Sequence, residues 1–237
     1  MKPLVIVGSA LILMFAFACG GGSSSSPSSP SAPSTPTPTS VTLQASAHVT
    51  VMMDSRNDTE ANQFHPWTGL SIGHEFLGSD GYRRSFGSAL KFNLPSQVTG
   101  RSVTKATLAL YVEDLRGDLT LYNPDGPTAS MNIQLRANAF TDNWDPASLS
   151  WNVWASLGVQ SAGEGLAYAP NQKGPVNFDI TAIARNWASG TWPNRGIKLA
   201  ADQYPDPGVK ALGTTTFCSP STPPPPCQRP ELVIEYQ

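Results

Sequence analysis

The sequence predicts an all-β fold: an antiparallel β-sandwich, jelly-roll-like, with one short helix packed against it. Charged residues make up only 14% of the 237-residue chain, whereas an average soluble domain has about 25%. Glycine and proline are frequent, at 20 and 22 residues, which favours short strands joined by many turns. Between these turns, segments recur in which every second residue is apolar, as in antiparallel sheets with one buried face.

The chain opens with a segment typical of an exported protein. Lys2 precedes an apolar run over residues 4–17. As a helix this run would rise about 21 Å, short of the ~30 Å core of a membrane, so we interpret residues 1–18 as a signal peptide. Small residues before Cys19 resemble a bacterial lipobox, which predicts that Cys19 is lipidated; the alternative is an ordinary secretory signal, cleaved just before this cysteine.

Residues 19–40 are expected to be the lipidated cysteine and a disordered tether. Residues 20–40 hold nine serines, five prolines, three glycines and three threonines, without a charge or an aromatic ring. Such a composition buries too little apolar surface to offset the entropy of ordering. We interpret it as a spacer between a membrane and a folded domain over residues 41–237.

Strands of this domain are predicted wherever apolar residues alternate. The segments are 41–45 continuing through 49–51, 88–94, 104–112, 132–137, 176–180, 196–201 and 231–236. The third shows the pattern well, because four apolar residues share one face of it: Ala106, Leu108, Leu110 and Val112.

One amphipathic helix is predicted after the segment 176–180. Asp179 can cap its first turn, and Gly190 can end it. Four apolar residues fall at i, i+3, i+4 and i+7: Ile180, Ile183, Ala184 and Trp187. We expect this stripe to lie against the sandwich, which makes Trp187 a core residue.

Cys218 and Cys227 flank a proline-rich segment. A disulfide between them is expected in an exported chain, because the compartment is oxidising. A metal site is the alternative, disfavoured because no histidine lies near either cysteine.

Composition and motifs argue against several functions. The formal net charge of -2 offers no basic surplus for nucleic acid. No nucleotide-binding or serine-hydrolase motif is present, and His74-Glu75 lacks the second histidine of the zinc-protease motif. We predict no enzyme activity and no cofactor, apart from a possible structural calcium ion held by oxygen ligands: Asp54, Asn57, Asp58 and Glu60.

Two polar-aromatic stretches are candidate sugar-binding sites. They contain His65 and Trp67, and then Arg83 and Arg84. Sugars present C–H faces that stack on aromatic rings, and hydroxyl or carboxylate groups that need polar partners. The alternative for each residue is a structural or solvated position. Two further tryptophans, Trp144 and Trp151, are predicted to be structural.

Several segments, in order, resemble the DNRLRE domain family, which is also grouped with carbohydrate-binding module family 96. They are residues 70–73, 82–94, 103–111, 144–152, 178–190 and 229–236. The resemblance implies a β-sandwich found on cell surfaces or in secreted polysaccharide-active proteins, whose characterised relatives bind alginate. The chain departs from the family at Asn93, at Asp145-Pro146 and in its cysteine-flanked loop, and it carries no catalytic domain.

The sequence therefore predicts a lipoprotein of the bacterial cell envelope, at the outer membrane or cell surface, that displays a polysaccharide-binding module. Its expected partner is a polysaccharide, such as acidic alginate, and its only membrane contact is the lipid. A structural or adhesive surface protein is the first alternative, and a small polysaccharide lyase or hydrolase the second.

Overall fold

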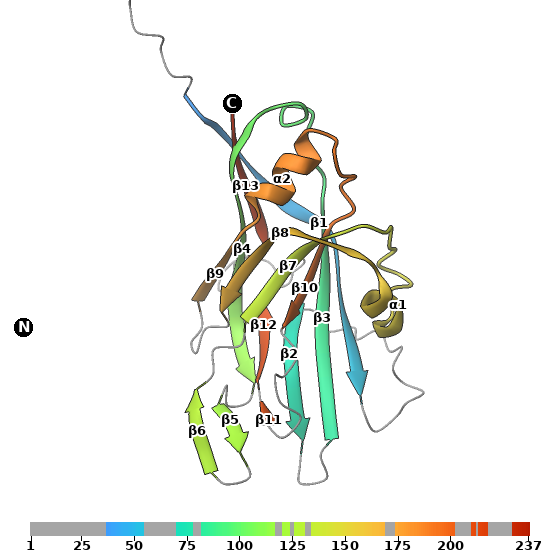
Figure 1. Ribbon diagram of the computed structural model, residues 1–237, viewed down its shortest axis with the longest axis vertical. Helices are drawn as coiled ribbons and strands as arrows, with labels where there is room; N and C mark the ends of the chain where they lie inside the picture. Colours follow the sequence, from blue (N-terminus) through green and yellow to red (C-terminus); the bar gives the residue numbers. More distant parts are fainter. Residues whose placement is uncertain are drawn as a thin grey trace, which may run out of the picture. The chain divides into compact units, whose positions relative to one another are not determined.

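The computed structural model describes residues 37–54, 70–77, 82–116, 120–123, 126–130, 134–168, 174–201, 210–211, 213–217 and 229–237 (Figure 1). Antiparallel strands dominate this part of the chain, which confirms the predicted all-β class. The strands of the main sheet are β1 (Thr39–Asp54), β2 (Leu70–Leu77), β3 (Tyr82–Phe92), β4 (Val103–Arg116), β7 (Gln134–Phe140), β8 (Val159–Tyr168), β9 (Gly174–Asp179), β10 (Ile197–Ala201), β12 (Gly213–Phe217) and β13 (Glu231–Tyr236).

The remaining elements are a small sheet and two short helices. The small sheet consists of β5 (Thr120–Asn123), β6 (Gly126–Ser130) and β11 (Lys210–Ala211). The helices are α1 (Trp151–Ser156) and α2 (Thr181–Ala188).

The main sheet closes on itself. Hydrogen-bonded neighbours run in the order β1, β13, β4, β12, β2 and β3, and β3 pairs with β1 again. Beyond β3 the sheet continues through β10 and β7 to β8, while β9 pairs with β4. Two layers result, one around β3 and one around β4, in agreement with the predicted sandwich.

Strand β1 belongs to both layers. Residues 39–44 pair with β13, and residues 45–54 pair with β3, with a shift of register between Ala45 and Ala47. A bulge bends a strand and increases its twist, so this irregularity lets one strand cross between the layers.

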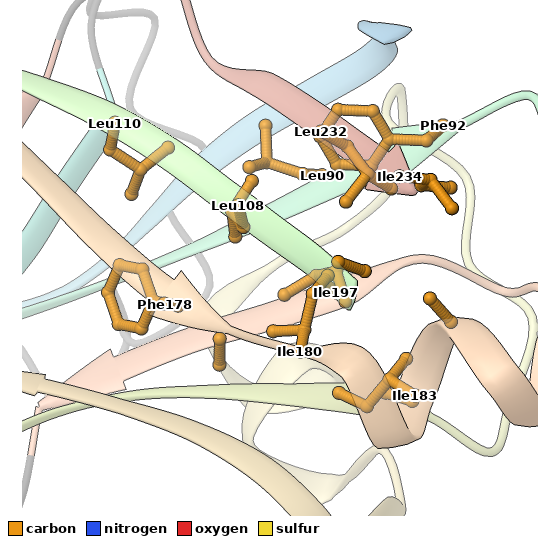
Figure 2. Packing of buried hydrophobic residues seen from close by; sticks show 14 of the residues in the cluster. Leu90, Phe92, Leu108, Leu110, Phe178, Ile180, Ile183, Ile197, Leu232 and Ile234 are labelled. Carbon is orange, nitrogen blue, oxygen red and sulfur yellow. The ribbon is translucent and has the colours of Figure 1, made fainter. Parts of the chain in front are cut away.

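Apolar side chains of both layers meet in one core. Figure 2 shows Leu108 and Leu110 of β4 in this core with Leu90 of β3, Phe178 of β9 and Ile183 of α2, and each of these side chains is buried. The other inward residues predicted for β4, Ala106 and Val112, are buried as well. Each fully buried leucine stabilises the fold by about 1.5–3 kcal/mol relative to an exposed one.

The predicted helix is α2, and Gly190 follows its end as expected, but the N-cap residue is Ile180, whose side chain makes no capping hydrogen bond. Asp179 lies one residue before the cap and binds Thr181 instead. The Asp179 carboxylate accepts hydrogen bonds from the backbone N–H of Thr181, at 2.9 Å, and from its hydroxyl, at 2.6 Å. Gly190 follows the helix with a φ of 75°, in the left-handed region that glycine tolerates. Trp187 is buried in the core, as predicted.

The alternation of apolar residues missed helix α1 and six strands: β2, β5, β6, β8, β11 and β12. Helix α1 has six residues, too few for a helical period to show. Strand β8 contains glycines because its neighbours lie close: a Cβ on Gly163 would come within 2.4 Å of the Ala182 Cβ, and one on Gly165 within 2.8 Å of the Ile180 Cγ2. Close packing against α2 and β9 thus excludes the side chains that would have identified the strand.

A second, smaller apolar cluster lies on the opposite face of the β3 layer from the core. Val49 and Val51 of β1 and Ala89 of β3 contribute to it from the sheet. The segment 140–157, which includes α1, covers them with six side chains: Phe140, Trp144, Leu149, Trp151, Trp154 and Leu157. This cluster fixes α1 on the outer face of the sheet, beside β1 and β3 (Figure 1).

Candidate functional site

A groove of about 430 Å³ opens where α1 meets the outer face of the β3 layer. Strands β1, β3 and β10 form its floor and α1 forms one wall. Its lining residues are Met53, Ser85, Phe86, Trp151, Trp154, Ala155, Lys198, Ala200 and Ala201. Most of the lining is apolar, with polar side-chain atoms from one serine, one lysine and the tryptophan indoles.

Trp154 packs directly on β3 because residue 87 is a glycine. A Cβ on Gly87 would come within 2.2 Å of the Trp154 ring. The Trp154 indole N–H donates to the Ser88 carbonyl at 3.3 Å, and the side chain is buried. The Trp154 indole is therefore fixed both by packing of its ring on Gly87 and by the hydrogen bond of its nitrogen.

Trp151 lies against Trp154 but is only half-buried. The two ring centroids are 5.0 Å apart, at an interplanar angle of 32°. Offset aromatic pairs of this kind are favourable, so Trp154 supports the orientation of Trp151. Among the described residues none accepts a hydrogen bond from the Trp151 indole N–H, which remains available to a ligand.

Lys198 brings a positive charge to the same groove. Its ammonium lies 4.3 Å from the centroid of the Trp154 ring and donates to the Trp154 carbonyl at 2.7 Å and the Ala155 carbonyl at 3.4 Å. Both carbonyls belong to the last turn of α1, where a cation is favourable. Within the part of the chain that the structure describes, no carboxylate pairs with Lys198.

Burial changes the chemistry of this lysine. Loss of solvent around the half-buried ammonium lowers the pKa of Lys198 from its ordinary value of 10.5. An ammonium has three N–H donors, and the carbonyls of α1 occupy at most two. Lys198 therefore has both a charge and a donor to offer a ligand.

Trp144 anchors the other end of the covering segment and has a structural role, as predicted. Its indole N–H donates to the Arg195 carbonyl at 2.8 Å. Lys91 lies 4.5 Å from the ring centroid and donates to the Trp144 carbonyl at 2.6 Å. Two lysine–tryptophan pairs thus hold the segment on the sheet, but only the pair of Lys198 and Trp154 lines the groove.

Of the four predicted sugar-binding residues, only Arg84 has a described side chain, and it does not line this groove. Arg84 is next to the lining residue Ser85, and alternation along β3 puts it on the other face of the strand. In register, Arg84 lies between Asp54 of β1 and Glu75 of β2. Arg83 belongs to the same strand, and its side chain is outside the described residues.

Other predicted positions also lie outside the described residues. These are Cys19, Asn57, Asp58, Glu60, His65, Trp67, Cys218 and Cys227. The predicted lipidation, disulfide and sites for sugar and calcium at these positions stay predictions. Within the described ranges, no group of three or more His, Cys, Asp or Glu side chains is placed to hold a metal ion.

The groove residues were missed for different reasons. Trp151 was interpreted as structural because its helix, α1, could not be recognised from six residues. Lys198 occupies a solvent-facing position in an alternating strand, where a lysine is ordinary. A signal for the site existed in Trp151 and Trp154, which share one face of a helix at i and i+3.

Comparison with known proteins gives no further assignment. Neither a scan against protein-family models nor a search of the curated proteins found a match. The resemblance to the DNRLRE family therefore stays a prediction.

Among the described residues, neither helix combines the length and apolarity needed to span a membrane.

Proposed function

We propose that the β domain is a non-catalytic module that binds polysaccharide in the groove beside α1. The observation that supports this most is the half-buried Trp151, oriented by Trp154 in a groove that also contains the Lys198 ammonium. Ligand sites in proteins are typically concave and mostly apolar, with a few polar groups that orient the ligand.

The groove chemistry favours a sugar that carries an anionic group. The indole of Trp151 offers an apolar face for the C–H groups of a sugar ring. The Trp151 N–H and the Lys198 ammonium are both donors, and a carboxylate is the acceptor that fits donors with a positive charge. An acidic polysaccharide such as alginate, which the family resemblance implies, meets these requirements.

The same proposal places the domain at the bacterial surface. Cys19 would carry the lipid, and the tether expected over residues 19–40, whose last two residues belong to β1, would separate the domain from the membrane. Mass spectrometry of the native product tests this part, because a mature chain without a fatty modification at Cys19 would exclude lipid anchoring.

Substitution of Trp151 tests the groove. We expect Trp151→Ala to lower affinity for alginate about tenfold or more, equivalent to about 1.4 kcal/mol. Trp192→Ala is the matched control, because Trp192 is also partly buried but packs against the main core. Affinity is measured by titration calorimetry on the full chain, after a glycan array has compared alginate with neutral polysaccharides.

Three outcomes would contradict the proposal. Equal losses for the two variants would remove the groove as the site, and release of shortened product would indicate a lyase or hydrolase. Binding to cell-surface protein with no binding to any glycan would favour the adhesive alternative.

A further inference from the structure

We propose that the bound polysaccharide extends beyond the groove, across β10 and β7 to β8, onto a second contact area formed by Arg136, Glu164 and Leu166. This inference rests on the proposed function and adds to it the class of ligand: an internal stretch of a polymer rather than a free sugar or a chain end.

Sheet register places the second area beside the groove. Ala200 lines the groove, its partner on β7 is Arg136, and the partner of Arg136 on β8 is Leu166. Adjacent strands lie about 4.8 Å apart, so the Cα atoms of Arg136 and Leu166 are roughly 5 and 10 Å from that of Ala200.

Side-chain alternation puts these residues on one face of the sheet. Leu135 and Ala137, on either side of Arg136, belong to the main core, so Arg136 lies on the outer face. Paired residues of neighbouring strands share a face, which places Ala200 and Leu166 there too. A ligand leaving the groove over Ala200 therefore meets Arg136 next.

The second area combines hydrogen-bond donors with hydrogen-bond acceptors. Arg136 forms an ion pair with Glu164 and donates to the Gln134 side chain at 3.2 Å. Arginine supplies N–H donors and glutamate supplies acceptors, both in planar groups, and sugar hydroxyls use both. Side-chain exposures of 33% for Arg136 and 25% for Glu164 leave the pair accessible while neighbouring residues hold it in place.

Leu166 adds an apolar contact. It is 46% exposed, the largest value among the exposed large hydrophobic residues that the structure describes, which are Leu166, Val153 and Val159. The β7–β8 ladder is interrupted close to it, because Ala137 pairs with Gly165 while Ala139 pairs with Gln160. Such irregularities are frequent next to binding sites, and here one borders the ion pair and Leu166.

The strip as a whole is complementary to an extended acidic chain. Lys198 carries one positive charge at the groove, and the charge of Arg136 is balanced by Glu164. The groove would hold the ring that stacks on Trp151, and the second area would hold later units of the chain through hydroxyl and C–H contacts. Only a ligand longer than the groove can contact both the groove and the second area.

Dependence on ligand length tests this arrangement. The full chain is titrated with a ladder of alginate oligosaccharides, from dimer to octamer, in wild type and in Arg136→Ala, Leu166→Gln and Val159→Ala variants. We expect wild-type affinity to rise with length beyond the shortest binding oligomer. Arg136→Ala and Leu166→Gln should lower affinity for the octamer about tenfold and leave that for the shortest binding oligomer unchanged.

Val159→Ala is the matched control, because Val159 is also an exposed apolar residue of β8 but pairs with Phe140, at the far end of the strand. It should behave as wild type. Leu166→Gln replaces an exposed side chain and so keeps the test valid if Arg136→Ala unfolds the protein.

Affinity independent of length, or equal losses for short and long oligomers, would overturn the extended path while leaving the groove intact. Absence of alginate binding in wild type would instead overturn the proposed function, and this inference with it.

Discussion

At the scale of single residues, the groove depends on contacts that alternation of apolar residues does not reveal. A glycine within a strand, such as Gly87, ordinarily marks a bulge or a weak point. In the structure, the absence of a side chain at Gly87 leaves the space that the Trp154 ring occupies. Lys198 likewise occupies an ordinary outward position of β10, and only its hydrogen bond to the end of α1 distinguishes it from other outward lysines.

The lowered pKa of Lys198 predicts how binding varies with pH. Because burial lowers this pKa from 10.5, the folded protein loses the positive charge at a lower pH than an exposed lysine would. We expect affinity for alginate, measured by titration calorimetry, to fall as the pH rises from neutral toward about 10. Lys198→Met should bind more weakly at neutral pH and show a much smaller fall.

Lys91→Met is the control for this prediction. Lys91 makes the same pair of contacts with Trp144, but it does not line the groove. This variant should keep the wild-type pH profile; a profile as flat as that of Lys198→Met would argue that the charge acts through the stability of the segment rather than on the ligand.

At the scale of elements, the start of α2 shows how local hydrogen bonds and tertiary contacts combine. Hydrogen bonds from the hydroxyl and backbone N–H of Thr181 lower the pKa of Asp179. The Thr181 hydroxyl in turn accepts from the Ala106 N–H of β4 at 2.9 Å. One short chain of hydrogen bonds therefore both begins the helix and attaches it to the sheet.

Asp179→Ala should lower the free energy of unfolding by about 1 kcal/mol near neutral pH, because the hydrogen bonds from Thr181 at the start of α2 are lost. An aspartate whose pKa is lowered by folding stabilises the native state above its ordinary pKa, near 3.8, and this stabilisation is lost as pH falls further through the native pKa. The difference between wild type and variant, measured by urea unfolding, should therefore shrink in acid.

Asp179→Asn separates charge from hydrogen bonding. The asparagine side-chain oxygen can accept the same hydrogen bonds from Thr181 but has no titratable proton, so this variant should retain most of the stability while losing its acid dependence. An equal loss in both variants, at every pH, would contradict the role of these hydrogen bonds.

At the scale of the whole molecule, a buried polar contact between β1, β2 and β3 supports the closure of the sheet. Strand β2 pairs with β3 only from Gly73 onward. Earlier in β2, the backbone of Ser71 is not paired with β3, and two buried hydroxyls bind it instead. The Thr50 hydroxyl accepts from the Ser71 N–H at 3.2 Å, and the Ser88 hydroxyl donates to the Ser71 carbonyl at 2.9 Å. The Thr50 hydroxyl then donates to that of Ser88, also at 2.9 Å.

Ser88→Ala is expected to lower the free energy of unfolding by about 1–3 kcal/mol, because it removes partners from buried polar groups. Since β1 pairs with both layers, we expect the variant to unfold in one cooperative transition, with far-UV circular dichroism and tryptophan fluorescence coinciding during urea unfolding.

Ser46→Ala is the matched control for this substitution. The Ser46 hydroxyl also donates to a β3 carbonyl, that of Lys91, but in an exposed position, so the effect should stay within about 0.5 kcal/mol. A loss as large as that of Ser88→Ala would contradict the importance of burial.

The sequence by itself determined the all-β class, the strands with regular alternation and helix α2, because their residues carry the period and caps of the element they form. The inward face of β4 and the burial of Trp187 could be predicted in the same way. Only the tertiary structure decided the passage of β1 between layers, the glycine-containing β8, and the groove. These features depend on which distant residues come close together, as Gly87 does with Trp154 and Lys198 with the end of α1, and contacts between distant residues leave no local period in a sequence.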